Sequence, residues 1–166
     1  MPLNAEEIEK FNDLFSESDK KNNGYLPKED ALPFFEKLGI KDNLSEKAQT
    51  TVVEGLSCRG EIKITKQILE NFYTVIKDQD DLGLLKVCLR GMTEPKKMNI
   101  SLTQAIELST MLGIPKTKGE LLGPNEDELK SFSFSNLADL FYEIKIPKES
   151  SQFDGFDISS KCCLLI

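Results

Sequence analysis

The residues best suited to chemistry form a polar run from Asp19 to Asp30, which carries carboxylate and amide side chains around a central glycine, Gly24. Oxygen ligands of this kind bind hard cations such as Ca²⁺. A second candidate is the thiol of Cys163, four residues from the end of the sequence, where a lipid could be attached. The sequence contains no His, which excludes Ser–His–Asp triads, Cys–His pairs and His-ligated zinc or haem. The pattern indicates cation binding and lipid attachment, and we expect no enzymatic activity.

Two amphipathic helices flank the polar run. Apolar residues recur at helical spacing from Ala5 to Ser18, where Asn4 and Glu7 form a capping-box pattern. Apolar residues recur again from Leu32 to Leu38, and Gly39 suits the end of that second helix. A helix, a polar twelve-residue loop with a central glycine and another helix together resemble the EF-hand family.

This resemblance implies a set of Ca²⁺ ligands. An EF-hand loop supplies oxygens from positions 1, 3, 5, 7, 9 and 12 and turns sharply at a glycine in position 6. The corresponding ligands here are the side chains of Asp19, Asn23 and Asp30 and the backbone carbonyl of Tyr25. Lys21 places a cation at position 3, and Asp30 is one methylene shorter than the usual Glu at position 12. We therefore expect weak Ca²⁺ binding, at one site per chain at most.

The hydrophobic pattern of this unit recurs three more times, which predicts four EF-hand-like units. The loops begin at Asp19, Ser57, Thr93 and Asn125. Their eighth positions, expected to face the core and to pair with a neighbouring loop, are all apolar: Leu26, Ile64, Ile100 and Phe132. The last interval is about one turn short, so we expect a truncated helix before Asn125, bounded by Pro115 and Pro124. The spacing is similar to that of calmodulin, troponin C and the myosin light chains.

The other three loops have lost the residues that ligate Ca²⁺. The second has Arg59 at position 3 and Ile68 at position 12. The third has Pro95 at position 3 and Gln104 at position 12, and the fourth has Leu129 at position 5. Because cationic and apolar side chains cannot balance a divalent ion, we predict that these loops bind no Ca²⁺.

The fold class expected is all-α, with two lobes that each pair two EF-hand units. Residues 1–75 form the first lobe and residues 82–147 the second. A polar connector around residues 78–81 separates them. From Pro147 onward the sequence lacks hydrophobic periodicity and is rich in Ser, Asp and Gly, which predicts a flexible tail over residues 148–166.

The leading functional hypothesis is a calmodulin-like calcium sensor or adaptor that binds a partner helix. In this family Ca²⁺ opens a lobe and exposes a hydrophobic groove, and the candidate groove residues here are Phe11, Phe15, Phe34, Phe35 and Leu38. The same spacing also predicts ordinary core packing. The net charge of −7 favours a basic, amphipathic partner and argues against nucleic acid. We expect a monomer.

An alternative is a calcium-independent subunit similar to a myosin light chain, which would clasp a target helix with EF-hand units that bind no ion. The three degenerate loops favour this alternative, whereas the lipidation motif does not. An enzyme is disfavoured because, in addition to lacking His, the sequence has no phosphate-binding G-x-x-x-x-G-K motif.

The last four residues, Cys163 to Ile166, match the C-a-a-X prenylation motif. One prenyl group gives weak anchoring, so Cys162 is a candidate for palmitoylation as a second signal. The acidic first residues show no signal peptide. We therefore expect the protein on the cytoplasmic face of a membrane, held there by lipid.

Overall fold

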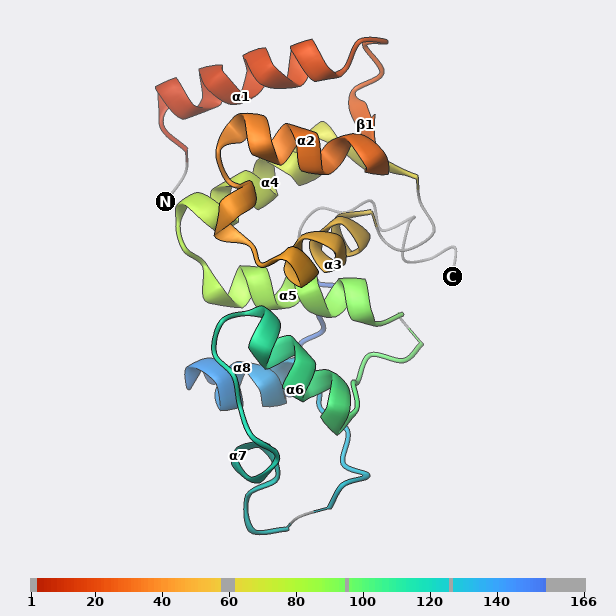
Figure 1. The fold of residues 1–166 in the computed structure, drawn as a ribbon, viewed down its shortest axis with the longest axis vertical. Coiled ribbons are helices and arrows are strands. Elements are labelled where there is room, and N and C mark those ends of the chain that lie inside the picture. Colours follow the sequence, from red (N-terminus) through yellow and green to blue (C-terminus); the bar gives the residue numbers. More distant parts are fainter. Residues whose placement is uncertain (1–2, 58–61, 95, 126, 155–166) are drawn as a thin grey trace.

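The computed structural model describes residues 3–57, 62–94, 96–125 and 127–154, which are mostly helical with one small two-stranded sheet (Figure 1). This agrees with the predicted all-α class at the level of helical content. In chain order the elements are α1 (Ala5–Ser18), β1 (Tyr25–Pro27), α2 (Lys28–Leu38), the 3₁₀ turn η1 (Lys41–Asn43), α3 (Glu46–Leu56), β2 (Lys63–Thr65), α4 (Lys66–Lys77), α5 (Asp81–Met92), α6 (Leu102–Met111), α7 (Lys118–Leu122), the 3₁₀ turn η2 (Gly123–Asn125) and α8 (Phe134–Tyr142).

Local signals in the sequence set several helix ends. At the start of α1 the Glu7 backbone N–H donates to Asn4 Oδ1 at 2.8 Å, and the Asn4 N–H donates to Glu7 Oε2 at 2.9 Å. This confirms the predicted capping box. Gly39 follows α2 with a φ of +79°, and Gly113 lies near the end of α6 with a φ of +77°. Both glycines adopt a left-handed conformation that other residues rarely take.

The loops lie in adjacent pairs, held by the residues expected at their eighth positions. Strands β1 and β2 are antiparallel, with Leu26 opposite Ile64. Further along the chain, Ile100 and Phe132 form an isolated antiparallel bridge, in which each backbone N–H donates to the other residue's carbonyl at 2.9 and 2.8 Å. All four side chains are almost completely buried. The first loop is therefore joined to the second, and the third to the fourth.

The helix before the fourth loop is short, as predicted. Helix α7 has 5 residues, whereas α1 has 14. Thr117 caps α7 and accepts a hydrogen bond from the Glu120 backbone N–H. Pro115 and Pro124 flank the helix. Pro124 lacks the N–H needed to extend the helix at its C-terminal end, and Pro115 disfavours a helical conformation in the residue before it.

Helices α3 and α5 cross in close contact at the middle of the molecule, where Figure 1 shows them side by side. A Cβ on Gly55 would lie 2.0 Å from the Val87 carbonyl oxygen, and a Cβ on Gly91 would lie 2.1 Å from the Thr51 carbonyl oxygen. Only glycine permits the two backbones to approach this closely. Buried apolar residues from both halves of the chain form one continuous core.

The segments predicted as a polar connector and as a flexible tail both have defined contacts. Only residues 78–80 separate α4 from α5, and Asp80 caps α5 by accepting a hydrogen bond from the Gly83 backbone N–H at 2.9 Å. The predicted flexible tail begins at Lys148, but residues 151–153 instead contact the end of α5 and the loop after it, and Gln152 is only 1% exposed. The sequence prediction relied on polar composition, and that composition does not show which polar groups find buried partners.

The described residues include no helix that is both long enough and apolar enough to span a bilayer.

Candidate functional site

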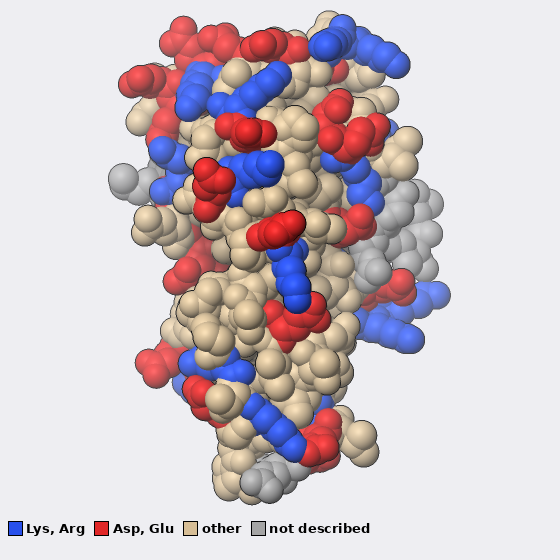
Figure 2. Space-filling view, viewed as in Figure 1, with Lys and Arg blue, Asp and Glu red and all other residues tan. Residues whose placement is uncertain are grey.

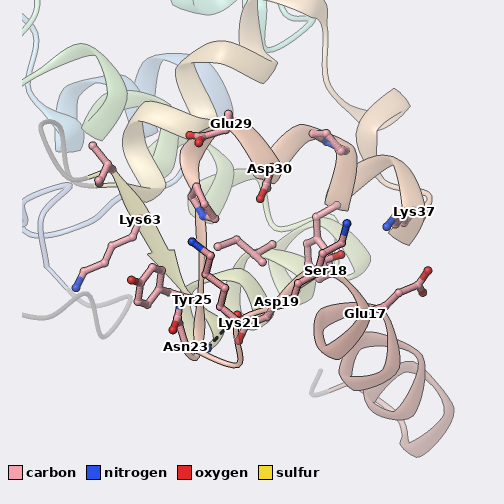
Figure 3. A pocket seen from close by; sticks show the side chains of 16 residues that line it. Glu17, Ser18, Asp19, Lys21, Asn23, Tyr25, Glu29, Asp30, Lys37 and Lys63 are labelled. Atoms are coloured by element: carbon pink, nitrogen blue, oxygen red, sulfur yellow. Dashed lines mark hydrogen bonds between the residues drawn. The ribbon is translucent and has the colours of Figure 1, made fainter.

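The first loop lies beside a pocket of about 930 Å³ (Figure 3). The loop between α1 and β1 forms one wall, and the first turns of α2 form another. The predicted ligand residues Asp19, Asn23, Tyr25 and Asp30 all line this pocket. The structure therefore brings them to one place.

Asp19 closes the first loop from within. Its Oδ1 accepts a hydrogen bond from the Asn23 backbone N–H at 3.0 Å, and its Oδ2 accepts one from the Gly24 N–H at 2.8 Å. The chain can turn toward the carboxylate because Asn22 and Gly24 have φ values of +53° and +82°. Both oxygens of the expected position-1 ligand are thus engaged by loop amides.

Two other residues of the pocket bear on how the loop could bind a divalent cation. Asp30 lies in the first turn of α2, and Lys21 lines the same pocket and extends into it in Figure 3. Across the described part of the chain, no three His, Cys, Asp or Glu side chains are grouped so as to hold a metal ion. Ca²⁺ requires six to eight oxygens, and an ammonium group nearby opposes its charge. The charge of Lys21 therefore weakens the attraction of this loop for Ca²⁺.

In the third and fourth loops, the side chain at position 12 serves as a helix cap. Gln104 Oε1 accepts a hydrogen bond from the Ser101 N–H at 2.9 Å, and Asn136 Oδ1 accepts one from the Ser133 N–H at 3.0 Å. Their oxygens therefore stabilise the starts of α6 and α8. In the second loop, residues 58–61 lie outside the described residues.

A residue that sequence reasoning missed lies against the third loop. The side-chain amide nitrogen of Gln152 donates to Thr93 Oγ1 at 2.9 Å and to the Met98 carbonyl oxygen at 2.7 Å. Thr93 and Met98 occupy positions 1 and 6 of that loop. No sequence signal pointed to Gln152, because it lies in a polar segment without periodicity.

The candidate groove residues lie in the core, so the structure does not present them as an open groove. The exposed fractions of Phe11, Phe15, Phe34, Phe35 and Leu38 are 0%, 4%, 1%, 1% and 3%. The rings of Phe11 and Phe34 pack edge-to-face with centroids 5.5 Å apart, and those of Phe35 and Phe72 are 5.2 Å apart. Aromatic contacts and burial favour this closed arrangement.

A second pocket, of about 540 Å³, lies between α4, α5, the start of α8 and residues 146–154. Lys86 lines it, and burial together with the nearby Arg90 lowers the pKa of its ammonium group. Apolar side chains of Val75, Leu82 and Phe134 form part of the wall.

The structure describes the thiol of Cys88 but not those of the two candidate lipidation residues. Cys88 is completely buried in α5, and burial raises its pKa to about 12, so it is unreactive. The candidate lipidation residues Cys162 and Cys163 lie outside the described residues.

Comparison with protein-family models, with curated proteins and with solved structures gave no match. Functional arguments therefore rest on the residues and geometry described above.

Proposed function

We propose that this chain is a non-enzymatic, EF-hand-like adaptor built from two pairs of helix-loop-helix units, and that it binds a helical segment of a partner protein. The main support is the pairing of the loops through Leu26 with Ile64 and Ile100 with Phe132. Those residues occupy equivalent positions in the four repeated units. Pairing through one equivalent position is what two EF-hand pairs require.

The geometry favours an adaptor that works without Ca²⁺, the role played by light-chain-like subunits. The carboxylate of Asp19 already closes the first loop by binding two backbone N–H groups. Lys21 brings a positive charge into the same pocket. Two backbone N–H groups of the loop thus stabilise the charge of the Asp19 carboxylate.

The calcium sensor is the second candidate, favoured by the position of Asp19. Its carboxylate faces the interior of the turn made by Asn23 and Gly24, where an EF-hand loop would direct its first ligand. Under this proposal Ca²⁺ binds weakly at the first loop, with Asp19, Asn23, Tyr25 and Asp30 as ligands, and no other loop binds it.

The partner proposed is a basic amphipathic helix. Besides the net charge of −7, exposed acidic residues follow the outer side of α1: Glu6, Glu9, Asp13 and Glu17. Figure 2 shows acidic side chains gathered at the end of the molecule where Figure 1 places α1. Access to the Phe11 and Phe15 side chains would require α1 to move away from α2.

Calorimetry separates the two candidates. The protein is titrated with Ca²⁺, and then, with and without Ca²⁺, with a designed helical peptide that carries leucine at positions i, i+3, i+4 and i+7 and lysine elsewhere. A peptide with glutamate in place of lysine is the control. Binding of the lysine peptide alone, with no heat from Ca²⁺, supports the ion-independent adaptor. Binding that requires Ca²⁺ supports the sensor. Failure of both peptides to bind contradicts the proposed class of partner.

Lipid anchoring through Cys163 is a separate proposal that rests on the C-a-a-X pattern of the sequence. The enzyme that reads this motif acts at a free carboxyl end, so mass spectrometry of the C-terminal peptide of the natural protein is the decisive measurement. Prenylated Cys163 supports the proposal, and a Cys163→Ser variant should then leave the membrane fraction. An unmodified peptide that ends in Leu164, Leu165 and Ile166 contradicts it.

A further inference from the structure

We infer that residues Ser150–Asp154 are an intramolecular latch that holds the third loop closed, with the side-chain amide of Gln152 bridging two loop oxygens in the manner of a bound ion. The inference concerns how the fold is held together, and it does not depend on the proposed partner or on Ca²⁺.

The first argument is the burial and bonding of Gln152. Its side-chain nitrogen donates to both Thr93 Oγ1 and the Met98 carbonyl oxygen, and its backbone carbonyl oxygen accepts a hydrogen bond from Arg90 Nε. Gln152 and Arg90 are each 1% exposed, and Thr93 is 4% exposed. Buried polar groups of this kind are costly unless they are paired, so these contacts fix the segment in place.

The second argument is that the group lying between Thr93 and Met98 must be a hydrogen-bond donor. The Thr93 hydroxyl donates its own proton to the Leu89 carbonyl oxygen at 2.6 Å. Its oxygen is then available only as an acceptor toward Gln152, and the Met98 carbonyl is also an acceptor. Both loop oxygens therefore need a donor or a positive charge between them. An amide NH₂ group has two N–H donors, which is one for each oxygen.

The third argument is that the segment has a shape of its own. The Ser151 N–H donates to Asp154 Oδ2 at 2.8 Å, and the Asp154 N–H donates to the Ser151 carbonyl at 3.0 Å. The resulting turn places the Phe153 ring 5.9 Å from the Arg90 guanidinium carbon, within the range of a cation–π contact. The turn thus presents Gln152 and Phe153 together to the end of α5.

The contacts connect positions 1 and 6 of a loop that lacks acidic ligands. In the first loop the position-1 side chain itself reaches the backbone of positions 5 and 6. In the third loop no such direct hydrogen bond is present among the described residues, and Gln152 links the two positions. The latch therefore supplies, from a distant part of the chain, the closure that the loop cannot make alone.

The test is hydrogen exchange, followed by mass spectrometry, on the full chain carrying Gln152→Met. Methionine has nearly the length and volume of glutamine but cannot donate. The amides of Ile100 and Phe132, which form the bridge between the third and fourth loops, should exchange about tenfold faster or more. The amides of the first loop should exchange at the wild-type rate. The matched control is Gln67→Met, because Gln67 is exposed and its side chain bonds only its neighbour Asn71 among the contacts described.

A second variant, Thr93→Val, removes one acceptor and preserves the shape of the side chain. It should accelerate exchange at the same amides, by a smaller factor than Gln152→Met. Circular dichroism reports whether each variant keeps its helices, and if Gln152→Met does not fold, the Thr93→Val result decides. Unchanged exchange in the third loop, or equal acceleration in the first and third loops, overturns the latch.

Discussion

The first and third loops have equivalent places in the repeated pattern, yet they are closed by different means. In the first, the carboxylate of Asp19 binds amides four and five residues away. In the third, the amide of Gln152 binds oxygens that are 59 and 54 residues away in sequence. The first loop is closed by its own carboxylate, and the third is closed by a hydrogen-bond donor from a distant part of the chain. Equivalent loops of one chain can therefore be held by hydrogen bonds from different sources.

The difference follows from the side chain at position 1. An ionised carboxylate accepts several hydrogen bonds and can draw the loop N–H groups around itself. The hydroxyl of Thr93 gives its proton to the preceding turn of α5 at Leu89, so it cannot organise the loop in the same way. Losing an acid at this position shifts the closure of the loop to contacts elsewhere in the chain.

The largest change is expected from Gly91→Ala, which disturbs helix α5, the helix that carries Arg90 and ends just before Thr93. The new Cβ would lie 2.1 Å from the backbone oxygen of Thr51, which cannot move without shifting α3. We expect the free energy of unfolding to fall by about 2–4 kcal/mol, measured by urea denaturation. The control is Gly119→Ala in α7, where the nearest atom is 4.0 Å away, and it should be neutral or slightly stabilising. Equal effects of the two substitutions would contradict the close crossing.

The next largest change is expected from Gln152→Met. The Met98 carbonyl loses its donor while the volume is kept, so the free energy of unfolding should fall by about 1–3 kcal/mol in a urea titration. Gln67→Met should change it by less than about 0.5 kcal/mol. A variant as stable as wild type would show that the third loop is closed without the latch.

Lys21→Asp should make the first loop more like a Ca²⁺ site. It should therefore increase the difference between the first loop and the third, which lacks acidic ligands. The change removes a cation and adds a third acidic side chain near Asp19 and Asp30, so Ca²⁺ affinity should rise about tenfold or more. Calorimetry should give a stoichiometry near one, and adding Asp19→Ala should abolish binding. A stoichiometry of two or more per chain would show that other loops bind Ca²⁺.

The smallest change is expected from Asp19→Asn, which keeps the shape of the side chain and removes its charge. One of its two loop hydrogen bonds should be lost, since an amide has a single acceptor oxygen. The hydrogen bonds are exposed, so the free energy of unfolding should fall by only about 0.5–1.5 kcal/mol. A larger fall in the free energy of unfolding for Asp19→Asn than for Gln152→Met would show that the contacts of the first loop contribute more to stability than those of the third.

The sequence predicted features that depend on neighbouring residues. The capping box of Asn4 and Glu7, the short helix before the fourth loop and the apolar eighth positions such as Leu26 were all found. Helical period, capping chemistry and loop spacing act over a few residues, so they can be recognised in one sequence.

The features that were missed are long-range. Gln152 lies in a polar segment whose composition favours disorder, and its acceptors are contributed by a distant loop. Gly55 and Gly91 appear in sequence only as helix residues of low propensity. Their role becomes visible once α3 and α5 are placed against each other. The sequence also left the placement of the candidate groove residues undecided, because the spacing of aromatic residues is compatible with both a buried core and an exposed surface.

The crossing of α3 and α5 also defines a symmetry relation. Gly55 and Gly91 each lie two residues before the first position of their loop, and Thr51 and Val87 each lie six residues before it. Gly55 meets Val87, and Gly91 meets Thr51. Such reciprocity is a property of a two-fold axis, so α3 and α5 are related by a local two-fold rotation about their crossing. Figure 1 shows α1 and α7 at opposite ends of the long axis, so one ligand that contacts both helices must span the length of the molecule.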